Sequence, residues 1–179
     1  LLALLVAGCA TLTPLDPALL ARLEPALGEL LLVGFTGTEG EENRELEQLL
    51  CETRVGGVLL FGRNVVDDTQ VRRLTTAIRG RAFACGAGVP LLATDAEGGR
   101  VMRLSPHAGY TSTPSAQELA DQGDLALTEL EARRIGRMLR EAGIDWDLAP
   151  VVDVGDNPVN AVIVGTGRSY GAHPLAVTA

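Results

Sequence analysis

Residues 90–103 read P-L-L-A-T-D-A-E-G-G-R-V-M-R, a short apolar run that leads into a dense cluster of charge. The apolar run Leu91–Ala93 lies between a proline and a Gly-Gly pair, which is typical of a strand buried in a parallel sheet. Four charged residues follow at its carboxyl end: Asp95, Glu97, Arg100 and Arg103. Packing requires no such density of charge, and ligands of α/β proteins bind outside the carboxyl ends of strands. The sequence therefore predicts a ligand site in this stretch.

The pattern of an apolar run followed by polar residues recurs along the chain. It predicts strands at residues 30–35, 57–61, 91–94 and 146–154. Helical spacing predicts helices over residues 41–51, from Asp67 or Asp68 onward, and over residues 124–142, where Gly143 is placed as the C-terminal cap. Strands that alternate with helices in this way imply a parallel sheet with right-handed crossovers.

Two α/β architectures fit this pattern: a doubly wound sheet and a TIM (β/α)8 barrel. Polar residues after every strand favour the barrel, because its βα loops share one face. The first strand is followed by neither a GxGxxG motif nor a P-loop, which weakens the case for a nucleotide-binding sheet. A complete barrel has eight strands in about 250 residues, whereas the pattern above predicts four. We therefore expect the N-terminal half of a barrel, about four βα units, in a truncated chain.

Composition limits the classes of partner. The 179 residues are 46% hydrophobic, enough for one domain with a core. The net charge of −8 and an aromatic content of 3% argue against a nucleic-acid surface, which needs basic patches and stacking platforms. Cys51 and Cys85 lack nearby histidines, so we expect no metal ion, and no other cofactor. The two cysteines form either a disulfide or two small buried apolar residues, and the sequence leaves both readings open.

The N-terminal segment Leu1–Cys9 resembles the end of a bacterial lipoprotein signal. Its apolar residues lead into V-A-G-C, in which small residues precede a cysteine that is lipidated after cleavage. The run is shorter than the roughly 20 residues that span a bilayer. We therefore expect lipidation of Cys9 and a lipid anchor in the membrane of the cell envelope, facing the periplasm or the cell exterior. The alternative is a frayed hydrophobic helix.

Five motifs follow one another in the chain. They are L-L-F-G-R-N at 59–64, D-A-E-G-G-R-V-M-R at 95–103, P-S-A at 114–116, A-G-I-D-W-D-L-A-P-V-V-D-V at 142–154 and G-R-S-Y-G at 167–171. Together they resemble the N-terminal part of the β-N-acetylhexosaminidases of glycoside hydrolase family 3. The form D-x-E-G-G-R-V-x-R points to the hexosaminidase branch. The resemblance divides the chain into a signal remnant (1–9), a tether and leading helix (10–27) and an incomplete barrel domain (28–179).

The resemblance implies a retaining hydrolase that removes terminal N-acetylglucosamine from glycosides such as the fragments of peptidoglycan recycling. In the family the reaction passes through a covalent glycosyl-enzyme on an aspartate, with a His–Asp pair as acid and base. Asp95 matches the family's aspartate that binds sugar hydroxyls. Arg103 and Arg168 match its two substrate-binding arginines, with Arg100 as an adjacent candidate.

The catalytic groups of the family are missing from this sequence. The motif K-H-F-P-G-H-G, which carries the histidine, is absent, and so is the segment with the nucleophilic aspartate. The order of motifs in the family implies that both lie beyond Ala179. His107 and His173 stand in no matching motif, so we expect a loop residue and a helix-start residue there. We therefore expect no catalytic residue and no turnover from this chain alone. The alternatives are a lipoprotein that binds sugar without cleaving it and a family 3 β-glucosidase relative.

For several other polar residues we expect structural roles rather than catalytic ones. We expect Glu97 to pair with Arg100 or Arg103 and to hold its loop rigid. Asp153 and Asp156 could form the carboxylate pair of a glycosidase, but the family comparison favours loop-shaping hydrogen bonds to backbone. We expect Arg63 and Asn64 on the rim of the site, where they support neighbouring loops.

Overall fold

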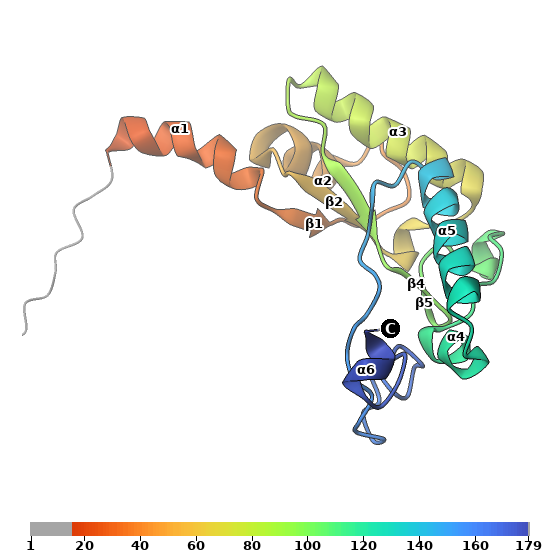
Figure 1. The fold of residues 1–179 in the computed structure, drawn as a ribbon. Helices are drawn as coiled ribbons and strands as arrows, with labels where there is room; N and C mark the ends of the chain where they lie inside the picture. The colour runs from red at the N-terminus through yellow and green to blue at the C-terminus, as the bar shows by residue number, and fades with distance from the viewer. Residues whose placement is uncertain (1–15, 179) are drawn as a thin grey trace, which may run out of the picture.

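The computed structural model describes residues 16–178 (Figure 1). Three parts of the chain named above lie outside the described residues: the signal remnant with its lipidation site Cys9, most of the tether, and Ala179. The expectation that the catalytic histidine and aspartate lie beyond Ala179 therefore stays a prediction, which this structure does not test.

Helix α1 (Pro17–Gly28) begins after Asp16, whose carboxylate accepts a hydrogen bond from the Ala18 amide at 2.9 Å. The helix projects away from the rest of the fold (Figure 1). Within residues 16–178, no helix is long and apolar enough to cross a membrane.

Four parallel strands form the central sheet, side by side in chain order. They are β1 (Leu32–Gly34), β2 (Gly57–Leu60), β3 (Leu91–Thr94) and β6 (Trp146–Asp147). β2 pairs with β3 over its whole length, with Gly57 opposite Leu91. This order is that of successive barrel strands, whereas the order in a doubly wound sheet reverses at its switch point. The predicted parallel sheet is confirmed, in the order expected of the barrel.

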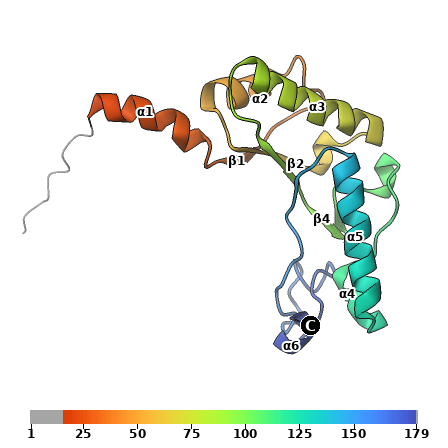
Figure 2. The same cartoon turned by 45° about the horizontal axis from the view of Figure 1, so that its top comes forward.

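Helices that follow the strands pack against this sheet. α2 (Arg44–Glu47) continues into a π-helical turn, η1 (Gln48–Thr53). Asp67, one of the two residues predicted to cap the next helix, is the N-cap of α3 (Asp68–Ala84). Figures 1 and 2 show α2 and α3 on the same side of the sheet, and α5 (Leu125–Glu141) ending against α3. The core consists of fully buried apolar side chains: Leu46, Leu50, Val58, Leu60, Val71, Ile78 and Leu92.

The fourth predicted strand, residues 146–154, is shorter than expected. β6 contains only Trp146–Asp147, because β3 leaves the sheet after Thr94. The last bond between them runs from the Leu148 amide to the Thr94 carbonyl at 2.9 Å. The chain beyond Leu148 has no strand on that side to pair with, so it runs irregularly to α6 (Pro174–Val177), the helix predicted to begin at His173.

A hairpin that the sequence did not predict follows β3. β4 (Ala96–Gly98) pairs antiparallel with β5 (Val101–Met102). Gly98 ends β4 and Gly99 begins the turn, with φ values of +90° and +56°, which glycine adopts without the steric cost of a side chain. A Cβ on Gly98 would also clash with the carbonyl oxygen of Pro114. Three short helices lie in the loops between the larger elements: η2 (Gly62–Asn64), η3 (Pro106–Ala108) and α4 (Ala116–Gln122).

A disulfide connects two of the helices on this side of the sheet. Cys51 lies in η1 and Cys85 caps the C-terminus of α3. Their sulfur atoms are bonded, and their Cα atoms are 5.5 Å apart, within the usual range for a disulfide. Of the two readings that the sequence left open, the structure has the bridge.

Candidate functional site

The two acids of the opening motif follow β3 directly: Asp95 precedes β4, and Glu97 is its middle residue. Ala96 and Gly98 are buried, whereas both acids are partly exposed. The pairing of β4 with β5 is irregular between Ala96 and Gly98, at the position of Glu97. Both acids therefore lie at the carboxyl end of β3, where the sequence predicted a ligand site, and each binds a different arginine.

Asp95 holds Arg103. Nε and Nη2 of Arg103 donate to the same oxygen, Oδ2 of Asp95, at 3.1 and 2.8 Å. The side chains of Arg103 and Asp95 remain 31% and 20% exposed, respectively. Within the described part of the chain, Oδ1 of Asp95 and Nη1 of Arg103 have no hydrogen-bond partner. The ion pair thus leaves one acceptor and one donor without a partner among the described residues, groups that suit the hydroxyls of a ligand.

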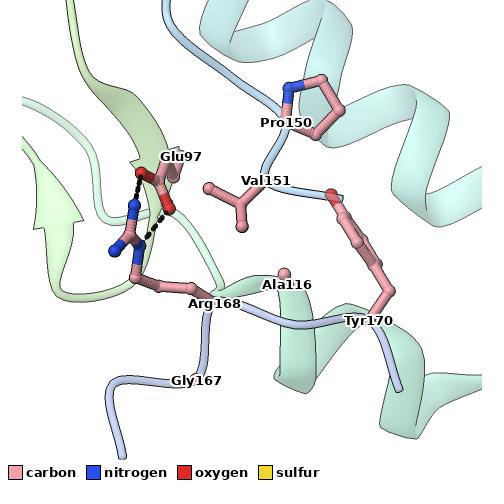
Figure 3. A pocket seen from close by; sticks show the side chains of 8 residues that line it. Glu97, Ala116, Pro150, Val151, Gly167, Arg168 and Tyr170 are labelled. Atoms are coloured by element: carbon pink, nitrogen blue, oxygen red, sulfur yellow. Dashed lines mark hydrogen bonds and ion pairs between the residues drawn. The ribbon is translucent and has the colours of Figure 1, made fainter. Parts of the chain in front are cut away.

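Glu97 holds Arg168, from a loop far along the chain. Nε of Arg168 donates to Oε2, and Nη2 to Oε1, each at 2.7 Å (Figure 3). The Glu97 side chain is only 7% exposed. Its carboxylate raises the already high pKa of the arginine, so the guanidinium stays charged. The prediction that Glu97 pairs with Arg100 or Arg103 is wrong, because Asp95 occupies Arg103 and Arg168 reaches Glu97 from across the fold.

Arg100 stands apart from both ion pairs. It is exposed, and its Nη1 donates to the Gly165 carbonyl at 3.4 Å, a long contact with the loop that carries Arg168. Arg100 therefore lies at the edge of the cluster.

Asp147 joins the cluster and was missed in the sequence. It ends β6, and its Oδ1 accepts a hydrogen bond from the Ala96 amide at 2.9 Å. Burial, together with the charges of Asp95 and Glu97, raises the pKa of the Asp147 carboxyl to about 6, although the hydrogen bond from Ala96 lowers it. The available signal was the alternation in D-W-D at residues 145–147, which sends two carboxylates to the same side of a strand that ends at the site.

Two hollows adjoin these pairs. The one beside Glu97 and Arg168 has a volume of about 10 Å³, room for one water molecule, and is walled by Pro150, Val151 and Tyr170 (Figure 3). Figure 3 shows the third nitrogen of the Arg168 guanidinium, Nη1, pointing away from Val151 and Tyr170. The second hollow measures about 230 Å³ and lies between the loops that follow β2 and β5, with Arg103 in its wall.

The rim residues of the second strand support their neighbours, as predicted. Asn64 is fully buried; it donates to the carbonyls of Phe35 and Gly37 at 3.2 and 2.6 Å and accepts from the Phe61 amide at 2.9 Å. Nε of Arg63 also donates to the Phe35 carbonyl, at 3.1 Å. These bonds join the loops after β1 and β2 at the site's edge.

Residues predicted further along the chain lie outside the cluster. The carboxylates of Asp153 and Asp156 are exposed and make no hydrogen bond within residues 16–178, so the predicted bonds from these side chains to backbone are wrong. Asp153 shapes its loop through its carbonyl oxygen, which accepts from Oγ of Ser169 at 2.7 Å. His107 is exposed in η3, and His173 is the N-cap of α6.

The comparison with protein families decides the identity of this fold. Residues 22–179 match the model of the family described as "Glycosyl hydrolase family 3 N terminal domain". The chain belongs to glycosyl hydrolase family 3. The family 3 β-N-acetylglucosaminidase from Paenibacillus sp. str. FPU-7 has a similar structure, with a TM-score of 0.81 and 35% identity over 87% of this chain and 28% of that one. The predicted TIM barrel type of fold is thereby confirmed.

Three further relatives bear on the chemistry. Beta-hexosaminidase LpqI of Mycobacterium tuberculosis is 37% identical over 91% of this chain and 38% of its own length. The NagZ structure from Neisseria gonorrhoeae in complex with N-trifluoroacetyl-D-glucosamine has a TM-score of 0.64 and 30% identity over 82% of this chain and 42% of that one. Beta-hexosaminidase A of Pseudoalteromonas piscicida is 37% identical over 85% of this chain and 28% of its own length. The chain therefore spans less than half of the length of each of these relatives.

Proposed function

We propose that this chain forms the sugar-binding half of the barrel of a retaining β-N-acetylhexosaminidase, an enzyme that hydrolyses terminal N-acetylglucosamine from glycosides. Its membership of family 3 and the names of its relatives support this proposal. The observation that carries it is the pair of anchored arginines at the carboxyl end of β3, Arg103 on Asp95 and Arg168 on Glu97.

The proposed chemistry of this half is binding. Oδ1 of Asp95 accepts from sugar hydroxyls, and Nη1 of Arg103 and of Arg168 donate to oxygens of the same sugar. Arg100 adds charge from the edge. The acid, base and nucleophile belong to parts of the family's barrel that this chain does not cover, beyond Ala179, so we expect residues 1–179 alone to give no turnover.

The test uses the full-length gene product that contains this chain, with chromogenic N-acetylglucosaminide and glucoside substrates. We expect N-acetylglucosaminide hydrolysis, and a loss of roughly 100-fold in kcat/KM for Asp95→Ala, because two charge-assisted hydrogen bonds are removed. Glu129→Gln is the control, since it breaks an exposed ion pair with Arg133 on α5. Preference for the glucoside would favour the β-glucosidase alternative. Binding without hydrolysis would favour a non-catalytic sugar-binding lipoprotein.

We further propose that the protein is lipid-anchored through Cys9, faces the periplasm or the cell exterior, and acts on peptidoglycan fragments. The V-A-G-C motif supports the anchor, and the bonded Cys51 and Cys85 support an oxidising compartment. The test is fractionation of cells that express wild type or Cys9→Ser. We expect the wild type in the membrane fraction and the variant outside it; equal partition of both would refute the anchor.

A further inference from the structure

We propose that Glu97 is a positioning residue that fixes the Arg168 guanidinium for its ligand. This inference rests on the proposed function, because it takes the sugar as the ligand of Arg168. It gives the glutamate of the D-A-E-G-G-R motif a role distinct from that of Asp95, whose free oxygen is available to a ligand.

The geometry engages Glu97 with Arg168 and shields it from direct contact with a ligand. Both of its oxygens accept from Arg168 at 2.7 Å, and only 7% of its side chain is exposed. Arg168, by contrast, uses Nε and Nη2 and keeps Nη1 without a partner among the described residues. The two-bond fork therefore fixes the plane of the guanidinium and directs its remaining donors away from Val151 and Tyr170 (Figure 3).

The location of Arg168 explains why such an anchor is needed. Residues 148–173 contain no helix or strand, so the regular structure of the fold does not orient this loop. The backbone of the loop is tied to α4 by a hydrogen bond from the Gln117 amide to the Gly167 carbonyl at 3.1 Å. That bond sets the position of the main chain but not the direction of a long, flexible side chain. Glu97, on the hairpin next to β3, supplies the direction.

Glu97→Gln tests the proposal, because glutamine keeps the shape and removes the charge. Glu131→Gln is the matched control: Glu131 accepts Nε and Nη2 of Arg134 at 2.8 and 2.6 Å and is 15% exposed, but it lies on α5, outside the site. Both variants are made in the full-length gene product. The measurements are kcat and KM with the chromogenic N-acetylglucosaminide, and the hydrogen exchange of the Arg168 Nε–H in an NMR spectrum, assigned with Arg168→Lys.

For Glu97→Gln we expect KM to rise roughly 10- to 100-fold with kcat within about threefold of wild type, because Arg168 contributes binding in the ground state and the transition state alike. We expect fast exchange of the Arg168 Nε–H in this variant, and wild-type kinetics for Glu131→Gln. A collapse of kcat at unchanged KM would place Glu97 in the chemical step and overturn the proposal. Unchanged kinetics or an unchanged Nε–H signal would also overturn it.

A substitute variant and a second measurement distinguish failure of this proposal from a folding defect and from failure of the proposed function. If Glu97→Gln does not fold, Arg168→Lys replaces it, since lysine keeps the charge and loses the fork; an unchanged KM would then refute the proposal. If the wild type hydrolyses no N-acetylglucosaminide, the proposed function fails. The positioning role is then decided by the exchange of the Nε–H in wild type and variant.

Discussion

Removal of the Cys51–Cys85 bridge should lower the free energy of unfolding by about 4 kcal/mol. The bridge closes a loop with a sequence separation of 34 residues. In the chain-entropy treatment, a loop of that size restricts the unfolded chain by about 12–13 cal/mol/K, which is about 4 kcal/mol at 25 °C. The double variant Cys51→Ser/Cys85→Ser removes this restriction and replaces two sulfurs with hydroxyls of similar size.

The assay is urea unfolding of the full-length gene product, oxidised and reduced, beside the double variant. At a typical slope of about 2 kcal/mol/M, the midpoint should fall by roughly 2 M on reduction or on substitution. The double variant should be insensitive to reductant, which serves as the internal control. Free thiols at both positions in the unreduced protein, or equal midpoints for its oxidised and reduced forms, would refute the reasoning.

Two other predictions concern polar residues at the site. Burial raises the pKa of Asp147 to about 6 from an ordinary 3.8, so the folded state binds more protons than the unfolded state between these values, and stability falls as pH rises through that interval. Asp147→Asn should abolish this dependence. It should also add about 1–2 kcal/mol to the free energy of unfolding at pH 7, after allowance for solvent screening of a half-buried group. A variant whose thermal stability falls from pH 4 to pH 6 as steeply as that of the wild type would contradict this. Asn64→Ala should cost about 2–3 kcal/mol, measured by urea unfolding, because the Phe61 amide and the Gly37 carbonyl lose their side-chain partner and the Phe35 carbonyl keeps only Arg63. A loss below about 1 kcal/mol would show that water replaces the amide.

The strands and helix caps that depend on the local residue pattern could be predicted from the sequence. Strands β1, β2 and β3 and the N-cap Asp67 follow from apolar runs and from a capping side chain, and all are present. The hairpin was missed because A-E-G-G-R-V reads as a polar loop. Its Gly98 lies against the backbone of Pro114, where a side chain would clash, and the residue pattern does not show that contact.

The partner of Glu97 could not be predicted for the same reason. Arg100 and Arg103 are close in sequence, but the arginine that binds Glu97 lies 71 residues away. Asp147 was missed because its burial depends on how β6 meets the hairpin. Both cases are decided by packing between elements, which residue pattern alone does not encode.

The spacing of Asp95 and Glu97 limits how this loop can change. The two acids are separated by one residue, and each is joined to its own arginine. Substitution of a residue elsewhere in the loop leaves that geometry in place. A one-residue insertion or deletion between the acids would move one of them relative to its arginine, because pairing with β5 holds the backbone on both sides of Glu97. The length of this segment should therefore tolerate less variation over evolution, or in engineering, than most of its individual residues.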